Sequence, residues 1–292
     1  MTTAAEAYFA RFRRVLEYID AHADADADLS VEALSTVAAF SKFHFHRQFS
    51  ESFGVGVHKY VQLVRLRRAS YRLAFRGDSI LDIALSSGYE SHEAFSRAFR
   101  KVFEQAPSEF RAEPDWQRFY QTQAPVTGVR SEHMSPVYRY EDVSIQEFPE
   151  TPVAVLEHRG DPRRIGESIR KFIEWRKQNR LPPRVSATFN LFYEPTESPE
   201  DFRLDLCAAI SSDIVPDSSG VTQKSIPAGR CAVLRHVGSD DTLGAAIHYL
   251  YSTWLPKSGE EPRDFPLFAR RVRFFPDVPE HEALTELYLP IA

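Results

Sequence analysis

The feature that most limits how this chain can fold is an internal repeat near its start. The segment "SKFHFHRQFSESF" (41–53) aligns with "SHEAFSRAFRKVF" (91–103) at an offset of 50 residues. In both copies phenylalanine recurs every four residues and so lines one face of a helix. The stretches before the copies, 31–40 and 80–89, also match and place Ala39 and Gly88 at a tight turn. Each copy is therefore predicted to be a helix-turn-helix.

The sequence between the two copies predicts a connecting helix. "HKYVQLVRLRRASYRLAF" (58–75) carries apolar residues at helical spacing, and Gly77-Asp78 ends it. Two helix-turn-helix motifs held by one connector can enter successive major grooves about one helical turn apart. One chain could then read an asymmetric DNA site without dimerising.

Charge is distributed unevenly along the chain. The net charge is −5, but residues 29–111 hold 12 Lys and Arg against 8 Asp and Glu. A basic segment inside an acidic chain is a weak electrostatic sign of nucleic-acid binding. It agrees with the helix-turn-helix prediction without proving it.

The first copy contains His44 and His46, which raises the question of a metal site. Helical histidines that share a metal usually lie at i and i+4, whereas these two point about 200° away from each other. With no cysteine or acidic cluster beside them, no metal site is expected. Phe45 and Phe49 take the buried face. The remaining face is either merely solvated or directed at base edges, and its members are Phe43, His46, Arg47 and Ser50.

A second repeat lies in the later part of the chain. "AVLEHRG" (154–160) and "AVLRHVG" (232–238) align at an offset of 78, and the match continues downstream. Each copy is predicted to run from an apolar strand through a glycine turn into a helix. Two further strands follow, "ATFNLFYEP" and "FRLDLCAAI" in the first copy, "RRVRFF" and "ALTELYLPI" in the second. We expect an α+β domain of two duplicated strand-helix-strand-strand units.

The first repeat also carries a family resemblance. "LSVEALSTVAAFSKFHFHRQFSESFG" and "SILDIALSSGYESHEAFSRAFRKVFEQAPSEFR" resemble the DNA-binding domain of AraC/XylS-type bacterial transcription regulators over about residues 8–111. The resemblance places base-reading side chains at Phe43, His46 and Arg47 in the first recognition helix. In the second helix it places them at His92, Glu93, Ser96 and Arg97. In some relatives only the first helix enters the groove.

Other basic residues of these helices are better placed to contact phosphates, which position a protein without reading sequence. They are Lys42, Arg100 and Lys101. The chain departs from the family pattern at Ser35, where alanine is usual, and at Val57, where proline is common. Neither change conflicts with a helix.

Residues 143–292 resemble the GyrI-like small-molecule-binding domain, which follows such DNA-binding halves in Rob-type regulators. The resemblance rests on "CAVLRHVGSDDTLGAAIHYLYSTWLPKSGEEPRDFPLF", "DFRLDLCAAI" and "LTELYLPI". It implies a lipophilic, often cationic effector held between the repeats by aromatic walls and an acidic residue, a combination that selects cations. The candidate carboxylate is Glu286. The candidate walls, which could equally be ordinary core, are Tyr193, Trp254, Phe268 and Tyr288. If Arg271 and Arg273 face the cleft, an anionic ligand is favoured instead.

The sequence thus predicts a multidomain chain. An all-α double helix-turn-helix domain occupies 1–112, a Pro-containing linker 113–142, and an α+β effector-binding domain 143–292. The expected function is sequence-specific transcription regulation, with double-stranded DNA and a small-molecule effector as partners and RNA polymerase as a further one. The rivals are a hydrolase, with Glu286 as general base, and a sequestering module. No His, Cys or Ser constellation supports catalysis, so neither a catalytic residue nor a cofactor is expected.

Cysteines and apolar runs bear on the compartment. The two cysteines, Cys207 and Cys231, lie in apolar strand-like runs and are expected to be buried thiols. No apolar run approaches the roughly 18 residues that cross a bilayer, and the first residues lack a signal-peptide core. We expect a cytoplasmic protein with no membrane partner.

Overall fold

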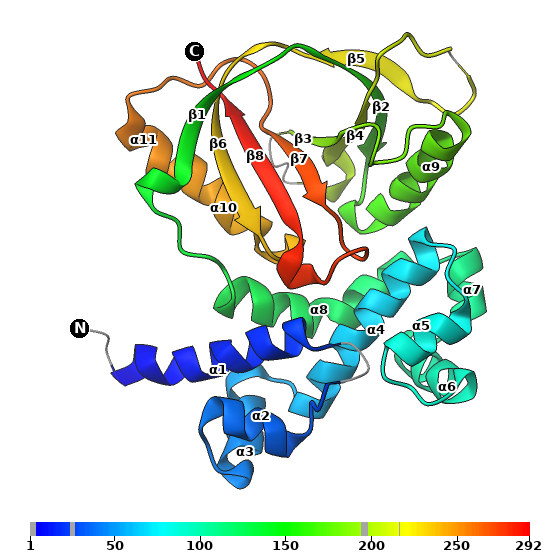
Figure 1. The fold of residues 1–292 in the computed structure, drawn as a ribbon, viewed down its shortest axis with the longest axis vertical. Coiled ribbons are helices and arrows are strands. Elements are labelled where there is room, and N and C mark those ends of the chain that lie inside the picture. The colour runs from blue at the N-terminus through cyan, green and yellow to red at the C-terminus, as the bar shows by residue number, and fades with distance from the viewer. Residues whose placement is uncertain (1–3, 24–26, 194–197, 216) are drawn as a thin grey trace. The chain divides into compact units, whose positions relative to one another are not determined.

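The computed structural model describes residues 4–23, 27–193, 198–215 and 217–292 (Figure 1). It contains two compact units. The first comprises Met1–Ser135 together with Phe275–His281, and the second comprises Pro136–Phe274 and Glu282–Ala292. The first is helical and the second is built on an antiparallel sheet, which confirms the predicted multidomain fold class. Within the described residues, no helix is long and apolar enough to cross a membrane.

The two helix-turn-helix motifs form where the repeat predicts them. Helices α2 and α3 make the first motif, α4 connects, and α5 and α6 make the second. The bounds in this unit are α1 Ala4–Ala21, α2 Val31–Ala38, α3 Lys42–Phe53, α4 Val57–Phe75, α5 Ile80–Ser86, α6 His92–Phe103, α7 Pro107–Ala112 and α8 Trp116–His133.

Both predicted turns have left-handed backbone. Ala39 has φ 52° and Gly88 has φ 79°. A β-carbon at residue 88 would meet only the far end of the flexible Arg65 side chain, so the second turn favours glycine for its left-handed conformation. Alanine at the first turn costs roughly 1–2 kcal/mol relative to glycine-like freedom.

The segment 113–142 was predicted to be a linker that is partly helical around Trp116–Tyr120, and it is instead helical over most of its length. It contains α8, an 18-residue helix that buries Trp116, Phe119, Val126 and Val129 in the core of the helical unit. Pro125 lies inside this helix. A proline there costs about 3 kcal/mol, whereas burying a large apolar side chain contributes about 1.5–3 kcal/mol each. Burial of four such side chains outweighs the proline, so the helical unit runs to Ser135.

The second unit is a curled eight-stranded antiparallel sheet in the described part of the chain, with strand order β1-β6-β8-β7-β3-β4-β2-β5. The duplication is confirmed: β2-α9-β3-β4 forms one half and β6-α10-β7-β8 the other. Strands β1 and β5 precede the first and the second half, and each pairs with the first strand of the other half: β1 with β6 and β5 with β2. The predicted end of the "ATFNLFYEP" strand, Glu194-Pro195, lies outside the described residues. The strand bounds are β1 Val143–Phe148, β2 Thr151–Arg159, β3 Thr188–Phe192, β4 Arg203–Ala209, β5 Thr222–Ile226, β6 Gly229–Val237, β7 Phe268–Arg273 and β8 Leu284–Pro290.

In the described part of this unit, the helices pack on one face of the sheet and none packs on the other. Helix α9 (Ile165–Gln178) packs there through Phe172 and Trp175. Helix α10 (Leu243–Tyr249) and the following turns, up to α11 (Leu255–Ser258), pack on the other half through Leu250 and Trp254. The opposite face, here called the inner face, holds a separate cluster rich in aromatic residues around Phe148, Phe189, Phe268 and Tyr288.

Candidate DNA-reading helices and effector-binding face

Helix α3 packs against the core through its phenylalanines and exposes the face that is predicted to read DNA. Phe45 and Phe49 are fully buried, with ring centroids 5.8 Å apart. Phe43 is 88% exposed on the same helix. Lys42, His46 and Arg47 are also exposed, and Lys42 pairs with Glu32 of α2. An exposed aromatic side chain on the same face as cations fits a surface that meets base edges.

Helix α6 is also packed against the core by its phenylalanines, but its predicted reading face is less exposed to solvent. Phe95, Phe99 and Phe103 are buried, and the Ser91 hydroxyl caps the helix by accepting from the Ala94 backbone N–H at 3.2 Å. His92, Glu93 and Arg97 are exposed, whereas Ser96 is half-buried. Hydrogen bonds from its own backbone and from Ser91 hold the pKa of Glu93 below its usual value. Glu93 therefore stays ionised at the helix start, where it also stabilises the helix.

The predicted phosphate contacts lie at the ends of the two recognition helices. Arg100 and Lys101 are exposed in the last turn of α6, and Arg100 lies 3.8 Å from Glu109 of α7. Partial burial and, next to it, the charge of Lys101 lower the pKa of Lys59 in α4.

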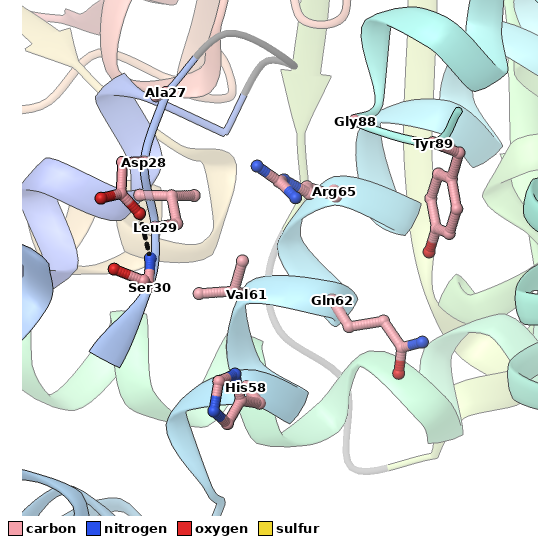
Figure 2. Close-up of a pocket in the computed structure, with 10 residues that line it drawn as sticks. All are labelled: Ala27, Asp28, Leu29, Ser30, His58, Val61, Gln62, Arg65, Gly88 and Tyr89. Carbon is pink, nitrogen blue, oxygen red and sulfur yellow. Dashed lines mark hydrogen bonds between the residues drawn. The ribbon is translucent and has the colours of Figure 1, made fainter. Parts of the chain in front are cut away.

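Between the motifs lies a hollow that sequence reasoning missed (Figure 2). Its volume is about 480 Å³, and α4 forms its floor with His58, Gln62 and Arg65. The walls are the segment before α2 and the turn before α6, and the remaining lining residues are Ala27, Asp28, Leu29, Ser30, Val61, Gly88 and Tyr89. The His58 ring lies 6.4 Å from that of His46 on α3. The spacing i, i+4, i+7 in "HKYVQLVR" was the available signal.

The composition of this hollow decides what it can hold. Its lining is polar, with Asp28 accepting from the Ser30 backbone N–H at 2.8 Å and Arg65 donating to the Ala23 carbonyl at 3.2 Å. Small-molecule effector sites are mostly apolar with a few polar groups. The hollow is therefore an extension of the polar surface between the recognition helices and not a second effector pocket.

On the inner face of the sheet, Glu286 is surrounded by cations and a phenol. Its carboxylate is 17% exposed, lies 3.5 Å from Arg235 and 3.9 Å from Arg270, and accepts from the Tyr288 hydroxyl at 3.1 Å. Burial and the Glu286 charge raise the pKa of Tyr288 to about 12. The predicted carboxylate is thus already neutralised within the protein.

The arginines that pair with Glu286 are Arg235 and Arg270, and not Arg271 or Arg273, which the sequence offered as the arginines of the cleft. Arg271 points to the helix-covered face, where it bonds Asn190 at 2.8 Å and Thr285 at 3.2 Å and pairs with Asp240. Side chains alternate along a strand, so Arg270 faces inward with Glu286. An irregularity in the β7–β8 pairing between Arg271 and Arg273 breaks the alternation, and Arg273 is exposed.

The other half of the sheet repeats this arrangement around Asp205, which was not predicted. Asp205 is opposite Glu157 in the β2–β4 register, as Glu286 is opposite Arg235 in the β6–β8 register. The Asp205 side chain is fully buried, accepts from the Tyr193 hydroxyl at 2.7 Å, and lies 3.1 Å from Arg203 and 3.3 Å from Lys224. Aligning "RLDLC" with "LTELY" places Asp205 on Glu286 and could have found it.

The predicted aromatic walls divide between the two faces. Phe268 and Tyr288 stack at 5.0 Å on the inner face, and Tyr193 packs against the same cluster. Trp254 does not join them: it is buried behind the sheet with Leu250, Leu287 and Leu289. Trp254 therefore does not line the inner face as predicted, because the helical turn that carries it packs on the helix-covered face of β8. Among the described residues, no three His, Cys, Asp or Glu side chains could hold a metal ion.

Comparison with known proteins gives two domain matches. Residues 141–292 match the GyrI-like small molecule binding domain, and residues 34–113 match a helix-turn-helix domain. The probable transcriptional regulator YgiV of Escherichia coli K12 is 38% identical over 154 residues, which cover 52% of this chain and 96% of YgiV. The right origin-binding protein of the same organism is 34% identical over 107 residues, 37% of this chain and 36% of that protein. The uncharacterised regulator YbfP of Bacillus subtilis 168 is 37% identical over 99 residues, 34% of this chain and 33% of YbfP.

Proposed function

This chain belongs to the family of GyrI-like small-molecule binding domains, and from that premise we propose how its parts work together. It is a transcription regulator that joins an AraC-type helix-turn-helix domain to a GyrI-like domain. We propose that α3 and α6 read DNA and that the inner face of the sheet binds the effector without changing it chemically. Contact with RNA polymerase stays a prediction.

The single observation that carries the DNA-reading proposal is the exposure of Phe43 beside Arg47. Phe43 has the geometry to pack on a thymine methyl, and Arg47 to bond guanine through two N–H groups. His46 completes this face. On α6, Arg97 is an exposed candidate, and Glu93 has a second role at the helix start. The phosphate contacts are assigned to Lys42, Arg100 and Lys101.

The charges on the inner face favour one class of effector. The fully buried Asp205 and the half-buried Glu286 each have two cations and one tyrosine hydroxyl as partners. A cationic effector would have to displace an arginine or a lysine from its carboxylate. An anionic headgroup can instead pair with Arg235 and Arg270, whose side chains are 65% and 49% exposed. We therefore favour an amphipathic effector with an apolar body and an anionic or hydrogen-bond-accepting head.

Binding without turnover follows from how the reactive groups are held. A general base needs a free lone pair and a suitable pKa, and Glu286 is occupied by two arginines and Tyr288. Burial raises the pKa of Cys231 to about 11 and that of Cys207 as well, so neither thiol is an activated nucleophile. These groups support a binding site better than a hydrolytic one.

A matched pair of probes tests the effector class. Decanoate and decyltrimethylammonium share an apolar chain and differ in head charge. At ten times its Kd, a ligand stabilises the folded chain by about 1.4 kcal/mol, which is roughly 3–6 °C of melting temperature for a domain of this size. We expect decanoate to raise the melting temperature of the full chain and Arg270→Ala to remove the shift, while Arg184→Ala, an exposed loop change, keeps it. Stabilisation by the cation alone would reverse the assignment.

A further inference from the structure

The helical unit is not continuous in sequence, because the segment 275–281 completes it. This segment follows β7 directly and leads into β8, the strands that carry Arg270 and Glu286. Within the helical unit, the Phe275 ring contacts that of Tyr71 of α4 at 5.0 Å. Asp277 accepts two bonds from the Arg76 guanidinium, at 2.6 and 2.9 Å. The hairpin between two strands of the effector-binding fold is thus a structural part of the DNA-binding unit.

Glu280 makes the deepest contact of this segment. Its carboxylate lies 3.1 Å from Arg67 Nε of α4 and pairs with Arg130 of α8. Arg130 also contacts Asp20 of α1 at 2.7 Å, and Arg67 donates to the Thr127 hydroxyl at 3.2 Å. The four charged side chains are each 8% exposed or less. Removal of the Glu280 charge would take a carboxylate partner from both buried arginines, which is costly in a buried ion pair.

We propose that Glu280 is a positioning residue that ties α4, the helix joining the two recognition motifs, to the strands of the effector-binding face. The proposal rests on the function proposed above for the two units. Arg67 belongs to α4, whose ends adjoin α3 and α5 in the chain, so the hold on Arg67 acts on both motifs. A ligand that moves Arg270 or Glu286 moves the strands that begin and end the segment 275–281. DNA bound to α3 and α6 acts on the same strands in return, because coupling between two sites is reciprocal.

One effect of Glu280 is measurable with DNA alone. In the full chain, we expect Glu280→Gln to weaken binding to double-stranded DNA selected from a random pool by at least tenfold. Asp277→Asn is the control, because this ion pair is partly exposed: the side chains of Arg76 and Asp277 are 29% and 54% exposed. We expect this substitution to change the affinity for DNA by less than twofold. Equal effects of the two substitutions would overturn the positioning role of Glu280.

Coupling between DNA binding and strands β7 and β8 must be measured by a quantity that a purely structural role of Glu280 would leave unchanged. Hydrogen exchange of the backbone amides of β7 and β8 is compared with and without the selected DNA. We expect at least a threefold change in exchange rate in the native chain. The double variant Arg67→Met/Glu280→Met removes one charge of each sign and keeps the Asp20–Arg130 contact. We expect it to stay folded and to bind the selected DNA at saturating concentration, with lower affinity than the native chain, while the exchange change disappears. DNA binding with unchanged β7–β8 exchange in the native chain overturns the inference, whereas no DNA binding at all refutes the proposed function.

Discussion

Phe43 offers a direct test of the reading face, because its role in stability and its role in binding can be separated. It is 88% exposed, so Phe43→Ala should change the free energy of unfolding by no more than about 0.5 kcal/mol. When the protein binds DNA, contact with a base removes part of the Phe43 ring from solvent. Full burial of a phenylalanine side chain contributes about 1.5–3 kcal/mol. Contact with one thymine methyl covers about a quarter of the ring, on the order of 0.4–0.8 kcal/mol or about two- to fourfold in Kd.

The assay measures Kd for selected DNA and the melting temperature on the same preparations. Phe49→Ala on the same helix is the opposite control, because its ring is fully buried and lies 4.7 Å from that of Phe53. We expect it to lower the free energy of unfolding by about 3–5 kcal/mol. If Phe43→Ala destabilises the fold and leaves Kd unchanged, Phe43 is a packing residue and the reading face is wrongly assigned.

Three further predictions concern binding and pH. Arg47→Ala should weaken specific binding by about 1–3 kcal/mol and relax the preference at one base pair, as measured by competition with single-base variants. Lys101→Ala should weaken all DNA alike and reduce the slope of log K against log salt by about one. His158 and His236 have their pKa lowered by burial from about 6.5, so the folded state favours their neutral form. The stability they contribute is complete above pH 6.5 and is lost as pH falls below it, which denaturant titrations of the native chain and His158→Gln should show.

Local periodicity was enough to predict the recognition helices. Phenylalanines four residues apart can only line one face, and that face became the core that seats α3 and α6. The same rule failed for α8, because Pro125 and the polar residues around it resemble a linker. Its helical state depends on burial of Trp116 and Phe119 against other helices, which is tertiary information.

The effector face was only partly predictable. Strand alternation placed Glu286 and Tyr288 on one face, and the internal repeat contained the signal for Asp205. Which arginine meets Glu286 depends on the β7–β8 register and its irregularity after Arg271, neither of which is visible in the sequence. The contact between Glu280 and Arg67 joins residues 213 apart and has no local signature.

Selection of bound sequences from random double-stranded DNA tests the central claim most directly. With the full chain, the account predicts an asymmetric motif of two sequence blocks about one helical turn apart. Arg47→Ala should relax the preference at one base pair of one block, and Arg97→Ala at one base pair of the other. Enrichment of a single block that Arg47→Ala leaves intact, or no enrichment at all, would contradict the reading of DNA by α3 and α6.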